Sequence, residues 1–318
     1  MKHLLFSGLT LAAAALAPGL AQAGCADFAS AGTGLSIEYN PFSSAPVNRT
    51  LTVRVSRVTP SATSVRFIIV DPNPARGASL LGVAGPAGYD IAWGRDASQP
   101  VFFHGAEQPN ATNGAVVSFG AGPSGDVVQE TFHLTVPPGQ SVGAGDYYEP
   151  LEIRYVCYSG DERLDSGEVQ SGGRVAIDLE VPEMLSAYVG SVGTRRGEID
   201  LGVLGREADS ASGSVVITTQ STAPYEIAVG AKWGVLRRSE ADTAGLPYAM
   251  RLSGLSVERG DTIVCDRTPA PAGRSHALQV SVKGEDAMSQ PAGAYSDVIT
   301  LTFAPRLGLS AQSGCSAV

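Results

Sequence analysis

The residues of this chain that could carry chemistry are few and scattered. Three histidines follow residue 24, namely His104, His133 and His276, and none has a second metal ligand at a close, regular spacing. His133 alternates within a stretch typical of a β-strand, where a histidine usually has a structural role. Carboxylates such as Asp126 and Glu130 could be paired on paper in many ways, so they identify no acid–base site.

Two common catalytic motifs are missing too. The sequence contains no catalytic-cysteine signature and no phosphate-binding glycine loop. We therefore expect no enzyme, no metal site and no cofactor. The formal net charge is −9, with acidic residues spread along the chain. Because nucleic acids and anionic membranes need a basic face, neither is an expected partner.

The four cysteines are expected to form disulfides. Their number is even and their spacings do not fit a zinc site. Four cysteines allow three pairings. If the chain has two domains, one bridge in each is the simplest arrangement, which pairs Cys25 with Cys157 and Cys265 with Cys315.

Residues 1–23 are typical of a secretory signal peptide. A short basic start precedes an apolar run, and Ala21-Gln22-Ala23 forms a small-x-small cleavage site. The apolar run is too short for a spanning helix. We expect the mature protein to begin at Gly24 and to be exported through the periplasm.

The remaining sequence predicts an all-β fold. Gly (38 residues) and Pro (20 residues) interrupt the chain often, and alternation with a period of two dominates between the breaks. This spacing favours antiparallel sandwiches. The length suits two domains, 24–181 and 182–318, with a boundary near Pro182. Expected strands are 35–39, 50–56, 64–70, 89–93, 115–119, 127–136, 151–157, 174–181, 198–204, 214–219, 225–230, 248–254, 277–282 and 298–303.

One sequence pattern occurs twice. AGDYYEPLEIRY (144–155) and AGAYSDVITLTF (292–303) align when Gly145 is placed on Gly293, 148 positions later. In each copy, alternation places three apolar residues on one face. The first copy is followed by another strand, 174–181, whereas the second is followed only by a proline and a tail with little alternation. The second domain is therefore predicted to lack its last strand.

The second half resembles the spore coat protein U-like domains, the subunits of archaic chaperone–usher pili. IDLGVLG (199–205) is similar to the first strand of such a pilin, and GLPYAMRLSG (245–254) to its Pro-Tyr segment. LSIEYNPF (35–42) looks like a variant of the early strand and turn. The resemblance covers most of 183–303, and 25–157 more loosely.

This resemblance implies two immunoglobulin-like β-sandwich domains in tandem, the second incomplete. A periplasmic chaperone would fill its groove first, and a neighbouring subunit would then donate a strand at the outer-membrane usher. Because almost nothing is expected ahead of Cys25, the chain would accept a strand without giving one. It is thus similar to the family's two-domain tip adhesin, extracellular at the pilus tip, mediating attachment to abiotic or host surfaces and biofilm formation.

The resemblance also implies which residues do this work. Apolar residues between 79 and 105, a stretch rich in glycine and proline, are the candidates for surface binding: Leu80, Leu81, Val83, Pro86, Val101, Phe102 and Phe103. The donor-strand groove would be lined on its two sides by Ile199, Leu201, Val203, Ile299, Leu301 and Phe303.

Two other interpretations remain open. The chain could be a free-standing secreted module that binds a glycan, in which 306–314 close the second sandwich. It could instead be a structural coat subunit. Proline at 305 and the scarcity of β-branched residues after it favour the open groove.

Overall fold

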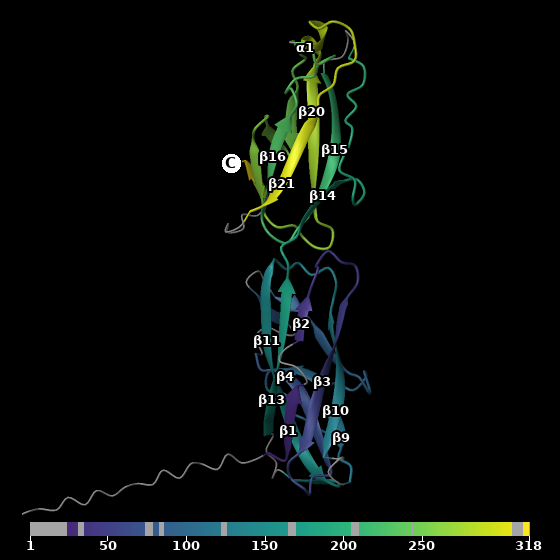
Figure 1. The fold of residues 1–318 in the computed structure, drawn as a ribbon, viewed down its shortest axis with the longest axis vertical. Helices are drawn as coiled ribbons and strands as arrows, with labels where there is room; N and C mark the ends of the chain where they lie inside the picture. The colour runs from purple at the N-terminus through teal and green to yellow at the C-terminus, as the bar shows by residue number, and fades with distance from the viewer. Residues whose placement is uncertain are drawn as a thin grey trace, which may run out of the picture.

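A computed structural model describes residues 24–30, 35–73, 79–82, 86–121, 126–164, 170–204, 210–242, 244–306 and 314–317. The protein is all-β, as the sequence predicts, and forms two immunoglobulin-like β-sandwiches stacked end to end (Figure 1). In the described residues the only α-helix is α1 (Gly284–Met288). No helix in this part of the chain is long and apolar enough to span a membrane.

The first sandwich consists of the strands between residues 26 and 181. One sheet has the order β1-β3-β10-β7, and the other has the order β2-β13-β11-β4-β8 with β5, β6, β9 and β12 attached. The pair β2–β13 is parallel, whereas β13–β11 is antiparallel. The strands are β1 (Ala26–Ser30), β2 (Leu35–Glu38), β3 (Val47–Arg57), β4 (Ser64–Asp71), β5 (Ser79–Gly82), β6 (Ala87–Gly88), β7 (Asp90–Trp93), β8 (Phe102–His104), β9 (Ala115–Ser118), β10 (Val127–Val136), β11 (Gly145–Ser159), β12 (Glu162–Arg163) and β13 (Gln170–Val181).

The second sandwich has a simpler layout. Its sheets have the orders β14-β15-β20-β17-β18 and β21-β16-β19-β22. The strands are β14 (Leu185–Val189), β15 (Ser210–Ser221), β16 (Tyr225–Ala231), β17 (Ala249–Leu252), β18 (Leu255–Val257), β19 (Thr262–Cys265), β20 (Arg274–Lys283), β21 (Ile299–Pro305) and β22 (Cys315–Ala317). No strand pairing between described residues joins this sandwich to the first.

Each sandwich buries its own apolar core, because alternate side chains of both its sheets point inward. In the first, Phe67 and Phe132 face each other across the sheets with ring centroids 5.7 Å apart. One disulfide joins Cys25 to Cys157 and the other joins Cys265 to Cys315. This is the pairing expected for one bridge in each domain.

The two sandwiches meet at a hydrogen-bonded junction centred on Thr222, which is 2% exposed. Its Oγ1 donates to the carbonyl of Pro182 at 2.8 Å, and its carbonyl accepts from the amide of Ala144 at 2.9 Å. Met184 closes the set, since its amide donates to Thr222 Oγ1 at 2.8 Å. The Thr222 hydroxyl therefore holds the linker, and the Thr222 carbonyl is bonded to the first sandwich at Ala144.

The second core contains the fully buried His276. Its Nε2 lies 2.7 Å from the Tyr225 hydroxyl and its Nδ1 lies 2.6 Å from Ser253 Oγ. Burial, with a smaller effect from Arg274, lowers the pKa of His276 to about 4. The ring is thus neutral at physiological pH, and both its nitrogens have hydroxyl partners.

We predict that His276 makes the second sandwich acid-sensitive. The unfolded chain, with an ordinary histidine pKa near 6.5, binds more protons than the folded chain between about pH 6.5 and pH 4. Stability is therefore undiminished above that range and falls as the pH drops through it, by up to about 1.4 kcal/mol per pH unit. Hydrogen exchange of β20 at pH 7.5, 5.5 and 4.5 should report this loss.

The matched variants are His276→Gln and His133→Gln, because His133 is exposed on β10. The first should flatten the pH dependence of β20 exchange and the second should leave it unchanged. An equal pH dependence in wild type and His276→Gln would contradict the assignment.

Candidate functional site

The repeated sequence pattern forms the same local structure twice. Tyr147 donates its hydroxyl proton to the carbonyl of Gly143 at 2.8 Å, and Tyr295 does the same to Pro291 at 2.7 Å. Both bonds reach back four residues, in the manner of the tyrosine corner of immunoglobulin-like folds. The preceding glycines have φ of +141° and +158°. β11 and β21 therefore occupy equivalent places in their sandwiches.

The surroundings of these two strands differ. β11 lies between β13 and β4, so both its edges are hydrogen-bonded. β21 pairs with β16 and ends its sheet. Within the described residues, nothing in the second sandwich takes the place that β13 has beside β11. The edge of β21 is thus open where the equivalent edge of β11 is closed.

The side chains follow this difference. Leu151, Ile153 and Tyr155 of β11 are at most 2% exposed. Their counterparts Ile299, Leu301 and Phe303 pack against the second core but remain only half-buried. A strand beside β21 would complete their burial. The structure thus brings together these three predicted groove residues as one apolar row along an open edge.

The opposite side of this row is formed by β14 and the segment 198–203. β14 lies close to β21 without pairing to it. Ile199 and Leu201 are half-buried over Gly213, where an added Cβ would stand 2.7 Å from Ile199 Cγ2. Val203 differs from its prediction: its side chain is 97% exposed and lines nothing.

The expected strand at 198–204 is also absent, since these residues have no regular secondary structure. The comparable segment of the first sandwich, β2, is a strand because it pairs in parallel with β13. Ile37 at its centre is fully buried. The segment around Ile199 and Leu201 has no such partner in the described part of the second sandwich, which explains why the pattern does not form a strand there.

The C-terminal tail turns away from the open edge. β22 pairs with β19, the strand at the far side of the sheet from β21, and the Cys265–Cys315 disulfide joins these two strands. Residues 307–313 lie outside the described residues. The described part of the tail therefore extends the edge opposite to β21.

The predicted surface-binding residues have mixed environments. Val101 is 2% exposed, so its side chain is not available to a surface, and this prediction is wrong. Phe102 and Phe103 belong to β8, which pairs with β4, and both are half-buried. Phe102 packs against the first core, and because successive side chains of a strand point to opposite faces, Phe103 lies on the other face of the sheet.

The rest of that set is only partly defined. Pro86 is exposed. Leu80 and Leu81 lie on β5, where Leu81 is the register partner of Tyr148 near the start of β11. That part of β11 adjoins the junction with the second sandwich through Ala144. Val83 lies outside the described residues.

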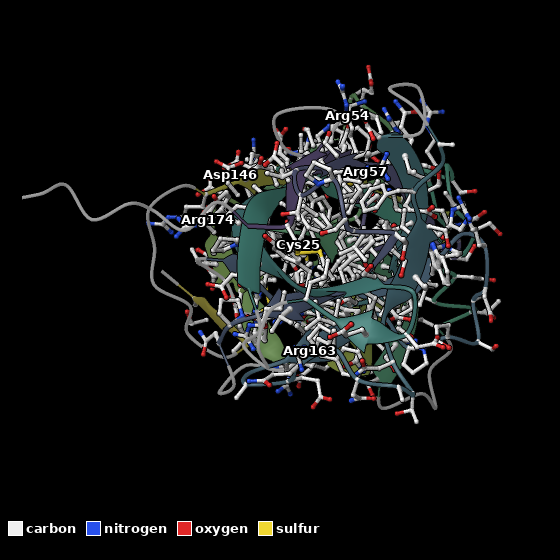
Figure 2. The ribbon with its side chains drawn as sticks, turned by 90° about the horizontal axis from the view of Figure 1, so that it is seen from below. Cys25, Arg54, Arg57, Asp146, Arg163 and Arg174 are labelled. Carbon is white, nitrogen blue, oxygen red and sulfur yellow. A yellow bond between two sulfur atoms is a disulfide. The ribbon has the colours of Figure 1, made fainter. Side chains whose placement is uncertain are left out.

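Exposed apolar residues occur instead at the opposite end of the first sandwich. Val58 is 46% exposed and Val127 is 36% exposed, and they flank the neighbouring ends of β3 and β10. We call this the distal end, seen from below in Figure 2 with Cys25 near the centre. Sequence reasoning missed it because single valines beside a turn give no periodic signal.

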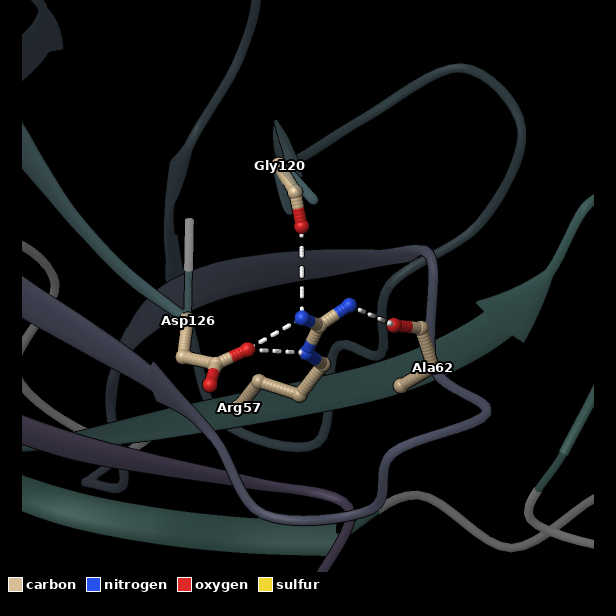
Figure 3. Close-up of polar contacts among 4 residues, drawn as sticks. All are labelled: Arg57, Ala62, Gly120 and Asp126. Atoms are coloured by element: carbon tan, nitrogen blue, oxygen red, sulfur yellow. Dashed lines mark hydrogen bonds and ion pairs between the residues drawn. The ribbon is translucent and has the colours of Figure 1, made fainter. Parts of the chain in front are cut away.

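Arg57 holds the distal end together (Figure 3). Its guanidinium donates through Nε to Asp126 Oδ1 at 2.7 Å, and a second N–H also reaches this carboxylate. It donates further to the carbonyls of Ala62 at 3.3 Å and Gly120 at 3.2 Å. One part-buried guanidinium thereby joins three separate segments of the chain, which fixes the backbone beside Val58 and Val127.

One cluster in the second sandwich has the composition of a metal site. Ligand atoms of Cys265, His276 and Cys315 lie within 4.8 Å of one another. The two sulfurs form a disulfide, and both ring nitrogens of His276 have hydroxyl partners. These atoms are therefore engaged in holding the fold.

Neither a protein-family model nor a curated protein matches the chain. Solved structures with a similar fold include the CupB6 tip adhesin of Pseudomonas aeruginosa, at 14% identity, TM-score 0.43, and coverage of 92% of this chain and 96% of that one. A chain of the CsuC–CsuE chaperone–tip adhesion subunit complex of Acinetobacter baumannii matches at 12% identity and a TM-score of 0.38. The match covers 86% of this chain and 99% of that one. CfaE, the adhesive subunit of CFA/I fimbria of enterotoxigenic Escherichia coli, is 15% identical with a TM-score of 0.38, and the match covers 91% of this chain and 97% of CfaE.

We predict that Arg57→Lys loosens the distal end. Lysine keeps the positive charge but cannot reproduce the planar fork. Amide exchange in 57–63 and at 126–128 should rise about tenfold, as expected when one or two net hydrogen bonds are lost. Because Asp126 is 41% exposed, charge alone contributes little there.

Arg54→Lys is the matched control, since Arg54 is an exposed arginine on the same strand. It should leave exchange at the distal end unchanged. Equal effects of the two variants would mean that the fork does not organise these segments.

Proposed function

We propose that the chain is a chaperone–usher pilus subunit of the tip-adhesin kind. Residues 24–181 form its surface-binding domain. Residues 182–318 form a pilin domain that accepts a β-strand from the adjacent subunit. A periplasmic chaperone would fill the same place during export, before the outer-membrane usher exchanges it for the neighbour's strand. The protein would then act outside the cell, in attachment and biofilm formation.

The observation that carries this proposal is the open edge of β21, whose equivalent on β11 is covered by β13. An exposed sheet edge with a half-buried apolar row is an aggregation hazard unless something pairs with it. An added strand would pair with the exposed edge and cover the apolar row. Its main-chain hydrogen bonds would give affinity, and its alternate side chains would give register.

The first sandwich indicates how the incoming strand would run. By analogy with β13, it would lie antiparallel to β21 and parallel to the segment around Ile199. β13 presents Val175, Ile177 and Leu179 to its core at alternate positions, all at most 2% exposed. The donated strand needs the same alternation of apolar side chains.

The energy of such a joint is substantial. Burying five apolar side chains at roughly 1.5–3 kcal/mol each gives a gross contribution on the order of 10 kcal/mol. Ordering the strand and losing its translational freedom reduce this figure.

For surface attachment we favour the distal end over the predicted 79–105 segment. Val58 and Val127 are exposed there on a backbone fixed by Arg57. The distal end lies at the opposite end of the molecule from the second sandwich (Figure 1). If the second sandwich joins the chain to a pilus, the distal end would therefore point away from that pilus. Apolar side chains at such an end suit an apolar surface better than a glycan.

Peptide binding tests the open edge. A labelled peptide with the sequence of β13 should bind the full mature chain and raise its melting temperature. A peptide with its apolar residues moved by one position should not, because a one-residue slip turns every side chain to the other face. Binding is read by fluorescence anisotropy.

Two variants of β21 serve as a matched pair in that assay. Leu301→Asp puts a charge into the apolar row and should weaken peptide binding by about 30-fold or more. Thr300→Asp adds the same charge on the exposed face and should change binding less than about threefold. Equal binding by the two variants, or no peptide binding by wild type, would rule out strand acceptance at β21.

Adsorption to polystyrene beads tests the distal end. The double variant Val58→Ser, Val127→Ser should bind about tenfold less, since it loses two exposed apolar side chains. Val216→Ser is the control and should adsorb like wild type, because Val216 is 49% exposed on β15 of the second sandwich, away from the distal end. Detergent should inhibit wild-type adsorption and simple sugars should not. The opposite pattern of inhibition would support the glycan-binding module.

A further inference from the structure

The turn that precedes β11 takes part in the contact between the two sandwiches. Gly143 is buried and Ala144 is half-buried. The amide of Ala144 donates to the carbonyl of Thr222 at 2.9 Å. Nearby in the chain, the backbone of Gly139 touches the side chain of Pro271, since a Cβ added to this glycine would lie 3.2 Å from Pro271 Cδ. One end of the first sandwich is thus covered by the second.

The equivalent turn of the second sandwich is bare. The offset of 148 residues that relates β11 to β21 places Pro291 and Ala292 where Gly143 and Ala144 stand in the first sandwich. Both Pro291 and Ala292 are exposed. Within the described residues, nothing accepts a hydrogen bond from the Ala292 amide. The same local structure is therefore covered at one end of the molecule and uncovered at the other.

This bare turn lies at the end of the second sandwich that is farthest from the first. β16 begins just after Thr222 and ends at Ala231, and Ala231 pairs with Ile299 at the start of β21. Figure 1 shows α1 at this same end. Two apolar side chains beside the turn face solvent, since Met288 is 61% exposed and Val298 is 58% exposed. We call the turn 290–294 with these two side chains the far pole.

The direction of a donated strand leads to the far pole. In the first sandwich, β13 ends at Val181 opposite Gly145, and only residues 182–184 separate it from β14. A strand that takes the equivalent place beside β21 ends opposite Gly293. The folded domain that follows such a strand after a similarly short linker then begins beside the far pole. The junction inside this chain is thus a covalent example of the joint that strand donation would form.

We propose that the far pole is a docking surface for the body of the subunit whose strand pairs with β21. This inference rests on the proposed strand acceptance and adds a second contact to it. The partner is a β-sandwich that presents the turn after its second strand, as the second sandwich presents Thr222. A main-chain carbonyl of that turn accepts the Ala292 amide, and Met288 and Val298 pack against the same turn. The joint then repeats the contact that already covers the turn before β11.

The distal end of the first sandwich has the backbone geometry that such a partner needs. The amide of Val58 donates to the carbonyl of Cys25 at 3.0 Å, and the amide of Thr222 donates to the carbonyl of Met184 at 3.1 Å. The chain therefore enters the two sandwiches in the same way. A donated strand placed directly ahead of Cys25 would present the distal end as the linker presents Thr222.

The test uses a second copy of this chain as the partner. The armed chain is the mature protein with residues 170–183 repeated directly ahead of Cys25, and it carries Leu301→Asp so that it does not accept a strand itself. Its binding to the wild-type mature chain is compared with that of the free peptide 170–183. The armed chain should bind about tenfold more tightly, because the second contact forms at a high effective concentration. Amide exchange at 291–293 should slow with the armed chain and stay unchanged with the peptide.

Two substitutions in the accepting chain make the test specific. Ala292→Arg should abolish the tenfold advantage and the slowed exchange, and it should leave binding of the free peptide within about twofold of wild type. Ser214→Arg adds the same side chain at an exposed position of β15 and should match wild type in every measurement.

The comparison separates this inference from strand acceptance. If the peptide binds but the armed chain binds no more tightly, or if Ala292→Arg keeps the full advantage, docking at the far pole is overturned while strand acceptance stands. If neither the peptide nor the armed chain binds, strand acceptance fails and this inference fails with it.

Discussion

The pairing of β13 with β11 is the interaction on which the first sandwich depends. It extends from Gly145 to Tyr155 along one strand and from Val181 back to Gln170 along the other. Through β13 it also holds β2, since that short strand has its parallel partner there. A single strand thus closes the edge of one sheet and fixes a segment that would otherwise have no backbone partners.

In its described residues, the second sandwich repeats the design without an equivalent of β13, and this has two consequences. β21 has the tyrosine corner of β11, yet its apolar row is half-buried. The segment around Ile199 has the alternation of a strand, yet it forms none. Both differences follow from one missing set of main-chain hydrogen bonds, because side-chain burial and strand formation each require a neighbour. A donated strand would correct both together.

Much of this could be predicted from sequence because it is periodic. Alternation located most of the long strands, and it predicted both ends of β10 correctly. The repeat anchored at Gly145 and Gly293 identified β11 and β21 as equivalent strands. Cysteine number together with a two-domain division gave the observed disulfides. Short strands such as β5 and β8 were not predicted, because a few residues carry too little periodicity to be recognised.

The candidate sites were less predictable for a physical reason. Alternation says that one face of a strand is buried, but it does not say whether a neighbouring strand is present to bury it. Val101 and Val203 illustrate the two errors: the first is buried in the core and the second is almost fully exposed. The distal end depends on Arg57 joining three segments that are far apart in the sequence, so it has no local signature.

The junction connects the second sandwich to the first through the end of β13. β13 ends at Val181 and β14 begins at Leu185, with Thr222 holding the residues between them by hydrogen bonds to Pro182 and Met184. A load applied to the second sandwich along the long axis would reach the first through the end of β13. Because β13 is paired along its length with β11, such a load acts on many hydrogen bonds at once rather than on one at a time. The strand that closes the first sandwich is therefore also the strand best placed to carry tension from an anchored second sandwich to the distal end.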